Sequence, residues 1–338
     1  MCGRRRLPFV SIEQPSVVAG SARAAEIAAR PELASALLPA VLLRPPAPVR
    51  LHLGRAPTRA GREQQRAAAR SMARALARRG FCVGEAGLPA ATTLQARLQL
   101  ERLRADGQLG EARFVRHGRT LDVEPASPRP PNRSDLTTRL RVRDDGAELG
   151  ALGAVDAALD GLAHDLLDAM AEDELRPAGG ASLVSGPTGG ALAYAGRADL
   201  QLSCFPSGGS CYLCHVDNAD GDGRTPPELG RVLSLVYYLG VASEPACDST
   251  CDEDGGALRI LLPPEAAALE PAFVRAAASR GAPHAAAVDV PPRAGTLCVF
   301  RADRIAHEVR PCFRDRYAAS LWVLARELPA TPCVHSGQ

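Results

Sequence analysis

The residues best suited to chemistry in this sequence are two histidines, one aspartate and one arginine. His215 and Asp217 stand two positions apart in the run CHVDNADGDGR, and His307 lies much further along the chain. On a strand, positions i and i+2 project to the same face, so the imidazole and the carboxylate can converge on one ion. Two histidines and one carboxylate form a facial triad that leaves coordination positions open, which suits a non-haem iron(II) centre. The pattern therefore predicts a metal site made by His215, Asp217 and His307.

Arg316 follows His307 at a distance that places both on neighbouring strands. A guanidinium there can grip a carboxylate through two parallel hydrogen bonds, which an ammonium group cannot reproduce. The chain contains no lysine at all. Schiff-base chemistry, a P-loop lysine and a protein-kinase lysine are thereby excluded.

Cysteines near the first histidine leave two other readings open. Cys211, Cys214 and His215 match C-x-x-C-H, the attachment signature of c-type haem. The same pair of thiols could combine with Cys247 and Cys251 in a tetrahedral zinc site. Buried cysteine in a reducing compartment is more often a small apolar filler, so neither reading displaces the facial triad.

The elements that must position these residues change character along the chain. The segment 62–80 is full of helix formers and ends at Gly80, and Thr92 or Thr93 can cap a second helix that runs to Arg104. After Gly150, apolar residues recur at helical spacing up to Met170. Beyond residue 190 the period becomes alternating, and short runs bounded by Gly, Pro and Asp predict strands at 199–205, 233–239, 257–262, 296–300, 306–310 and 317–324. Strands that follow one another without intervening helices predict an antiparallel sandwich or barrel supported by N-terminal helices.

Four motifs give the sequence a specific resemblance. HVDNADGDGR, LSLVYYL, GGALRILLP and HEVRPCFRDRYAASLWV are similar, in order and wording, to the oxygen-sensing prolyl hydroxylases that act on hypoxia-inducible factor. The chain also resembles the wider prolyl 4-hydroxylase superfamily of Fe(II)/2-oxoglutarate-dependent dioxygenases, over about 62–328. The resemblance implies a mostly β fold with some α: a double-stranded β-helix, or jelly roll, flanked by supporting helices.

The resemblance also implies roles for individual residues. His215, Asp217 and His307 would bind Fe(II), while Arg316 and Tyr238 would hold the distal carboxylate of 2-oxoglutarate. Trp322, Asn218 and Arg224 would border the substrate pocket. The implied reaction uses O2 and 2-oxoglutarate as cosubstrates and ascorbate as reductant, releases succinate and CO2, and hydroxylates a proline in a protein or peptide.

Two positions depart from the family pattern. Phe205 stands where the family has a tyrosine ten residues before the first iron ligand, and Cys214 stands where an arginine usually precedes the HVD triplet. Reaction type is therefore better specified than substrate. Two alternatives stay open: a 2-oxoglutarate dioxygenase that acts on another residue type or on a small molecule, and a non-catalytic binding module on the same fold.

Composition sets the remaining expectations. The formal net charge is only +2 with basic residues spread along the chain, so no nucleic-acid partner is expected. No apolar run is long enough to span a membrane. We expect disorder over 1–61, a helical support region over 62–198, the jelly roll over 199–328 and a tail over 329–338. Ten cysteines without a secretory signal indicate a cytoplasmic or nuclear protein, and the Arg/Ala-rich N-terminus leaves organelle import open. Oligomeric state is not encoded in these patterns.

Overall fold

The structure, a computed structural model, describes the greater part of the chain from residue 42 onward. The described residues are 42–43, 45–53, 59–112, 115–116, 119–120, 133–140, 149–172, 184–218, 228–241, 254–262 and 287–329. Three residues discussed above, Arg224, Cys247 and Cys251, lie outside these ranges. The predicted zinc pairing with Cys247 and Cys251 and the predicted role of Arg224 therefore stay predictions.

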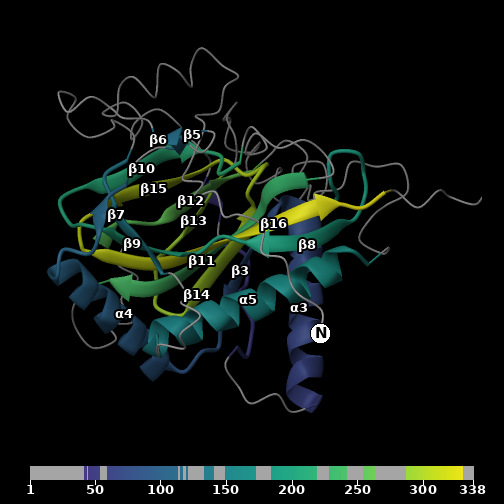
Figure 1. The fold of residues 1–338 in the computed structure, drawn as a ribbon, viewed down its shortest axis with the longest axis horizontal. Coiled ribbons are helices and arrows are strands. Elements are labelled where there is room, and N and C mark those ends of the chain that lie inside the picture. The colour runs from purple at the N-terminus through teal and green to yellow at the C-terminus, as the bar shows by residue number, and fades with distance from the viewer. Residues whose placement is uncertain are drawn as a thin grey trace, which may run out of the picture.

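Two β-sheets form the body of the protein (Figure 1). The nine-stranded sheet has the order β2 (Val49–Arg50), β3 (Phe81–Glu85), β14 (Thr296–Arg301), β11 (Glu228–Val241), β16 (Arg316–Glu327), β9 (Leu200–Phe205), β7 (Leu136–Leu140) and β4 (Gly110–Glu111), and β8 (Leu192–Arg197) also pairs with β16. The five-stranded sheet has the order β1 (Leu42–Leu43), β13 (Ala287–Val290), β12 (Leu258–Leu261), β15 (His307–Cys312) and β10 (Ser210–His215). A separate hairpin joins β5 (Val115–Arg116) to β6 (Arg119–Thr120). Two facing, mainly antiparallel sheets confirm the predicted jelly-roll class.

Three helices lie together on one side of the nine-stranded sheet (Figure 1). They are α3 (Arg59–Arg79), α4 (Ala90–Ala105) and α5 (Gly150–Met170), so the predicted helices are confirmed. The predicted threonine cap of the second helix is wrong. Pro89 occupies that position without a side-chain cap, whereas Thr93 lies inside α4 and shares a 2.5 Å hydrogen bond with the Tyr237 hydroxyl. The Thr93 hydroxyl therefore bonds to a side chain on β11 instead of capping its own helix.

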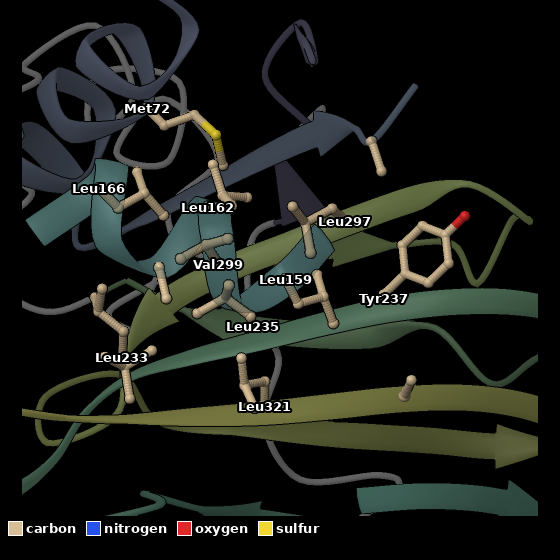
Figure 2. Packing of buried hydrophobic residues seen from close by; sticks show 14 of the residues in the cluster. Met72, Leu159, Leu162, Leu166, Leu233, Leu235, Tyr237, Leu297, Val299 and Leu321 are labelled. Atoms are coloured by element: carbon tan, nitrogen blue, oxygen red, sulfur yellow. The ribbon is translucent and has the colours of Figure 1, made fainter. Parts of the chain in front are cut away.

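The helices and the sheet enclose the larger hydrophobic core (Figure 2). Leu159 and Leu162 project from α5 toward Leu235 of β11 and Val299 of β14, and all four are completely buried. Apolar residues at helical spacing on α5 thus pack against apolar residues at alternate positions on the strands. This packing fixes the back of the sheet whose opposite face carries the site.

Truncation at this interface gives a first testable expectation. Leu162→Ala should lower the free energy of unfolding by about 2–5 kcal/mol, because it removes buried methyl groups and leaves a cavity. Urea denaturation measures the change. Leu94→Ala is the matched control, since Leu94 is 43% exposed on α4 and its truncation should change stability by less than about 0.5 kcal/mol. Equal losses in the two variants would contradict this assignment of the core.

The segment ahead of α3 corrects one expectation. Disorder was predicted over 1–61, but within 45–53 the strand β2 pairs in parallel with β3, and Leu51 and Leu53 are buried in the core. The amides of Leu51 and Leu53 donate to the carbonyls of Glu85 and Ala86 at 2.8 and 3.0 Å. Burial of two alternate leucines in the core holds this segment in place, despite the prolines before them.

The predicted boundary at 198/199 also needs correction. A strand at 81–83 was expected in this region and β3 confirms it, but β4, β7 and β8 also come from the region predicted to be helical, and all of them belong to the nine-stranded sheet. The described helices contain no span long and apolar enough to cross a lipid bilayer.

Candidate active site

Two side chains that are close in sequence meet a third that is distant, at the ends of two paired strands. His215 ends β10, His307 begins β15, and the two are directly opposite one another in the antiparallel ladder. Asp217 lies in the turn just after β10, not on the strand as expected, and its carboxylate returns to the same point. The ligand atoms of the three lie within 4.8 Å of one another, and the residues are only 3–5% exposed. Within the described residues, this is the group of histidine, cysteine and acidic side chains arranged to hold a metal.

Backbone carbonyls orient both imidazoles toward that point. The Nδ1 of His215 lies 2.7 Å from the Leu213 carbonyl, and the Nδ1 of His307 lies 3.1 Å from the Ile305 carbonyl. A carbonyl can only accept, so each Nδ1 carries the proton and each Nε2 keeps its lone pair. These Nε2 atoms lie 3.5 and 3.8 Å from Asp217 Oδ1. The two nitrogens and one oxygen are thus arranged for a common ion.

The other carboxylate oxygen of Asp217 is held in place by two donors. Ser234 Oγ donates to Asp217 Oδ2 at 2.5 Å, and the Trp322 indole nitrogen donates to the same atom at 2.9 Å. Oδ1 is left facing the histidines. The carboxylate is therefore held in place with Oδ1 available to a metal.

The protonation states also suit metal binding. Burial raises the pKa of Asp217, but the facing imidazoles of His307 and His215 lower it more, so the net pKa lies well below its ordinary value. Burial and the neighbouring His215 ring lower the pKa of His307 to about 4. A metal needs an ionised carboxylate and neutral imidazoles, and at neutral pH Asp217 and His307 supply them. The donor set fits a divalent ion with open coordination positions.

Arg316 begins β16 and lies in the same cavity as the triad. It is 2% exposed, and its guanidinium sits between the rings of Phe205 and Tyr238 at 4.8 and 4.9 Å. Arg316 Nε and the Tyr238 hydroxyl are buried and have no hydrogen-bond partner among the described residues. Buried polar groups without partners are rare, and this pair offers donors to an anion.

The strand β16 lines the cavity with every second residue. Arg316, Ala318, Ser320 and Trp322 share one face and all border the cavity, so alternation alone connects the arginine to the tryptophan. The predicted pocket residue Trp322 thus lies at the cavity wall, in addition to donating to Asp217. Phe205, opposite Arg316 in the ladder, contributes a ring face where the family pattern has a phenol.

The structure places Asn218 differently from the expected pocket position. Its side chain does not border the cavity that contains the triad; its amide donates to the carbonyls of Leu229 and Arg231 at 3.0 and 2.7 Å. The backbone N–H of Asn218 donates to the Ala302 carbonyl at 2.8 Å. Asn218, which directly follows the carboxylate ligand, is therefore anchored to β11 by its side chain.

This contact yields a second expectation. Asn218→Ala should cost about 1–3 kcal/mol of stability, because it leaves two buried carbonyls without their donor. Urea unfolding measures the cost, and Gln108→Ala, an exposed position, serves as control. Unchanged stability in Asn218→Ala would show that these carbonyls find other donors.

Several cavity residues were missed by the sequence reasoning. They are Arg133, Asp135, Gln201, Ser203, Tyr212 and Ser320, together with Ser234, which supports Asp217. Ser234 could have been predicted, because it lies an even number of positions from Tyr238 on the same strand and therefore projects to the same face. The C-x-x-C-H pattern falls on the strand β10, where Cys211 and Cys214 are free thiols and His215 belongs to the triad.

Fold and site together define a class of protein. Residues 200–324 match the family model of the 2OG-Fe(II) oxygenase superfamily, which is named for its use of Fe(II) and 2-oxoglutarate. The chain is 31% identical over 128 residues to Egl nine homolog 1 of Rattus norvegicus, which covers 38% of this chain and 28% of that protein. It is 32% identical over 132 residues to the hypoxia-inducible factor prolyl hydroxylase of Caenorhabditis elegans, covering 38% of this chain and 14% of that protein. The expected resemblance to prolyl hydroxylases is confirmed, although the match spans less than a third of these relatives' length.

A solved structure shows the same fold. The prolyl hydroxylase from Trichoplax adhaerens, in complex with a hypoxia-inducible factor peptide fragment, aligns with a TM-score of 0.54 over 79% of this chain and 93% of that one. The sequence identity in this alignment is 19%, so the comparison supports the architecture alone.

Proposed function

We propose that this chain is an Fe(II)- and 2-oxoglutarate-dependent dioxygenase that hydroxylates prolyl residues of a protein substrate. The observation that carries the proposal is one cavity lined both by the His215, Asp217 and His307 triad and by Arg316, whose buried Nε has no hydrogen-bond partner among the described residues. A metal site with open positions and an anchor for a second carboxylate are the two requirements of this cosubstrate. Two of the relatives that match part of this chain are named prolyl hydroxylases, which supports the choice of residue.

Each side chain has a definite task in this reaction. When bound, iron and 2-oxoglutarate supply the oxidising chemistry: one oxygen atom of O2 enters a C–H bond as hydroxyl, and the other enters succinate as CO2 leaves. The triad holds the metal, while Arg316 and Tyr238 hold the distal carboxylate. Trp322 closes the wall near the metal. Positioning and exclusion of water are what the chain itself contributes.

The direct test is anaerobic reconstitution with Fe(II) and 2-oxoglutarate, followed by air and a library of proline-containing peptides. We expect succinate and a peptide mass gain of one oxygen atom that is lost when the proline is replaced by alanine. Succinate without any modified peptide would reject the protein substrate. Cosubstrate binding without succinate would indicate a binding module instead of an enzyme.

One observation favours a second candidate, a dioxygenase acting on a small molecule or another residue type. Part of the cavity wall is polar, with Arg133, Asp135, Gln201 and Ser203 along it. A proline ring offers few hydrogen-bonding groups to such a wall. Succinate release stimulated by polar small molecules or by peptides lacking proline would favour this alternative.

Metal exchange provides a third expectation for the proposed enzyme. Affinity for divalent ions rises from Fe(II) to Ni(II) and Cu(II) at nitrogen and oxygen sites, so both ions should displace Fe(II) and inhibit. Titration of each ion into the Fe(II)-loaded enzyme measures this, and Mg(II), which prefers oxygen ligands, is the control. Inhibition by Mg(II) equal to that by Ni(II) would contradict a histidine-rich site.

Ascorbate, proposed as the reductant, should prolong turnover by keeping the iron ferrous.

A further inference from the structure

A buried ion pair lies next to the triad and takes no part in the chemistry assigned above. The Arg133 guanidinium donates to both oxygens of Asp135, at 2.6 and 2.8 Å, and the two side chains are only 3% and 1% exposed. Burying two charges costs much of what their attraction returns, so stability alone is a weak explanation for such a pair. Its position suggests another one.

The ion pair continues into a stack of planar groups that ends at an iron-ligand candidate. The Arg133 guanidinium carbon lies 4.6 Å from the centre of the Tyr212 ring. That ring is stacked on the imidazole of His215, with centroids 3.7 Å apart and planes 21° from parallel. Guanidinium, phenol and imidazole therefore follow one another, and Asp135 fixes the outer end.

The stack is attached firmly to β10. Arg133 forms an isolated antiparallel bridge with Tyr212, and the next residue, Ser134, exchanges several hydrogen bonds with the strand. Its amide donates to the Cys211 carbonyl at 3.1 Å, and its hydroxyl accepts from the Cys211 amide at 2.9 Å. The pair thus cannot move without moving the strand that carries His215.

We infer that Arg133, held by Asp135, is a positioning residue that acts through Tyr212 to fix the ring plane of His215. The Leu213 carbonyl constrains one atom of that ring, but it does not by itself prevent the ring from tilting about that hydrogen bond. The flat face of Tyr212 does. Arginine suits the outer position because its planar, forked group stacks and binds a carboxylate in two places, which lysine cannot do. This inference rests on the proposed metal-binding function of His215.

Binding of Co(II) to the metal-free full chain tests the inference without requiring turnover. Tyr212→Leu removes the flat face and should weaken Co(II) binding by about 10–100-fold, as loss of a group that orients a metal ligand does. Tyr212→Phe keeps the ring and should retain wild-type affinity and the wild-type absorption spectrum of bound Co(II). Arg133→Lys, which keeps the charge but loses the fork, should weaken binding by about tenfold. Tyr194→Leu, which removes a ring that packs against His164 outside the cavity, is the control and should bind normally.

The outcomes separate this inference from the proposed function. Wild-type affinity in Tyr212→Leu, or equal losses in the Phe and Leu variants, would overturn the positioning role while leaving the metal site intact. Urea unfolding of the metal-free variants adds a second readout: lower stability with unchanged Co(II) affinity would mean a merely structural pair, which also overturns it. A wild-type chain that binds no Co(II) would overturn both.

Discussion

Asp217→Ala should abolish succinate formation, with a loss of at least about 100-fold relative to the wild type. A displacement of about 1 Å can already cost that much in an active site, and here a ligand is removed altogether. The substitution also leaves Ser234 and Trp322 without the carboxylate oxygen to which both donate. The measurement is succinate release at saturating Fe(II) and 2-oxoglutarate.

His215→Ala and His307→Ala should reproduce this loss, because neither remaining pair of ligands can hold the metal in the same geometry. The matched control is His164→Ala on α5, where the ring packs against Tyr194 outside the cavity. That variant should keep wild-type activity. Turnover near the wild-type rate in any triad variant would remove that residue from the site. Circular dichroism of each variant shows whether the fold survives.

The triad residues could be predicted from sequence because ligand chemistry restricts the choice to few residue types. The HxD spacing and the later histidine and arginine lie in motifs whose order and wording carry a resemblance that the family match supports. Their convergence in space could not be derived from spacing. It depends on β10 pairing with β15, a contact between segments far apart in the chain, which only the complete fold establishes.

The strands that the sequence reasoning missed are short or atypical. β10 reads SCYLCH, where cysteines and histidine interrupt the alternation that marks a half-buried strand. β8 contains Gly196 and alanines, which have low strand propensity, and its place in the sheet depends on β16. In both cases the neighbouring strand, rather than local preference, decides the conformation.

The supporting contacts of the site were harder still to predict. A serine on β11 and a tryptophan on β16 reach one oxygen of Asp217, and the two residues are paired in the ladder. Likewise, Arg133 is brought against Tyr212 by a bridge between separate segments. Such contacts follow from strand register, which a single sequence specifies only through the buried pattern.

Arg316→Lys should raise the KM for 2-oxoglutarate by about 10- to 150-fold, since one charge-assisted hydrogen bond is worth roughly 1.5–3 kcal/mol. Lysine retains the charge but not the fork, and its ammonium group cannot stack between Phe205 and Tyr238 as the guanidinium does. The KM for the peptide substrate should change little, because the proposed function assigns this arginine to 2-oxoglutarate and not to the peptide.

The neighbouring Arg314 provides a close control for this prediction. Its side chain is 50% exposed and pairs with Asp254 at 2.7 Å, so Arg314→Lys should leave the KM for 2-oxoglutarate unchanged. Tyr238→Phe should raise that KM by a smaller factor, because it removes only a neutral hydroxyl donor. The three variants distinguish two explanations. If only a positive charge were needed, Arg316→Lys would leave the KM for 2-oxoglutarate unchanged. If the forked guanidinium and the neighbouring phenol both bind the carboxylate, the KM rises in both cavity variants and stays unchanged in Arg314→Lys. An unchanged KM in Arg316→Lys would therefore move the carboxylate anchor elsewhere in the cavity.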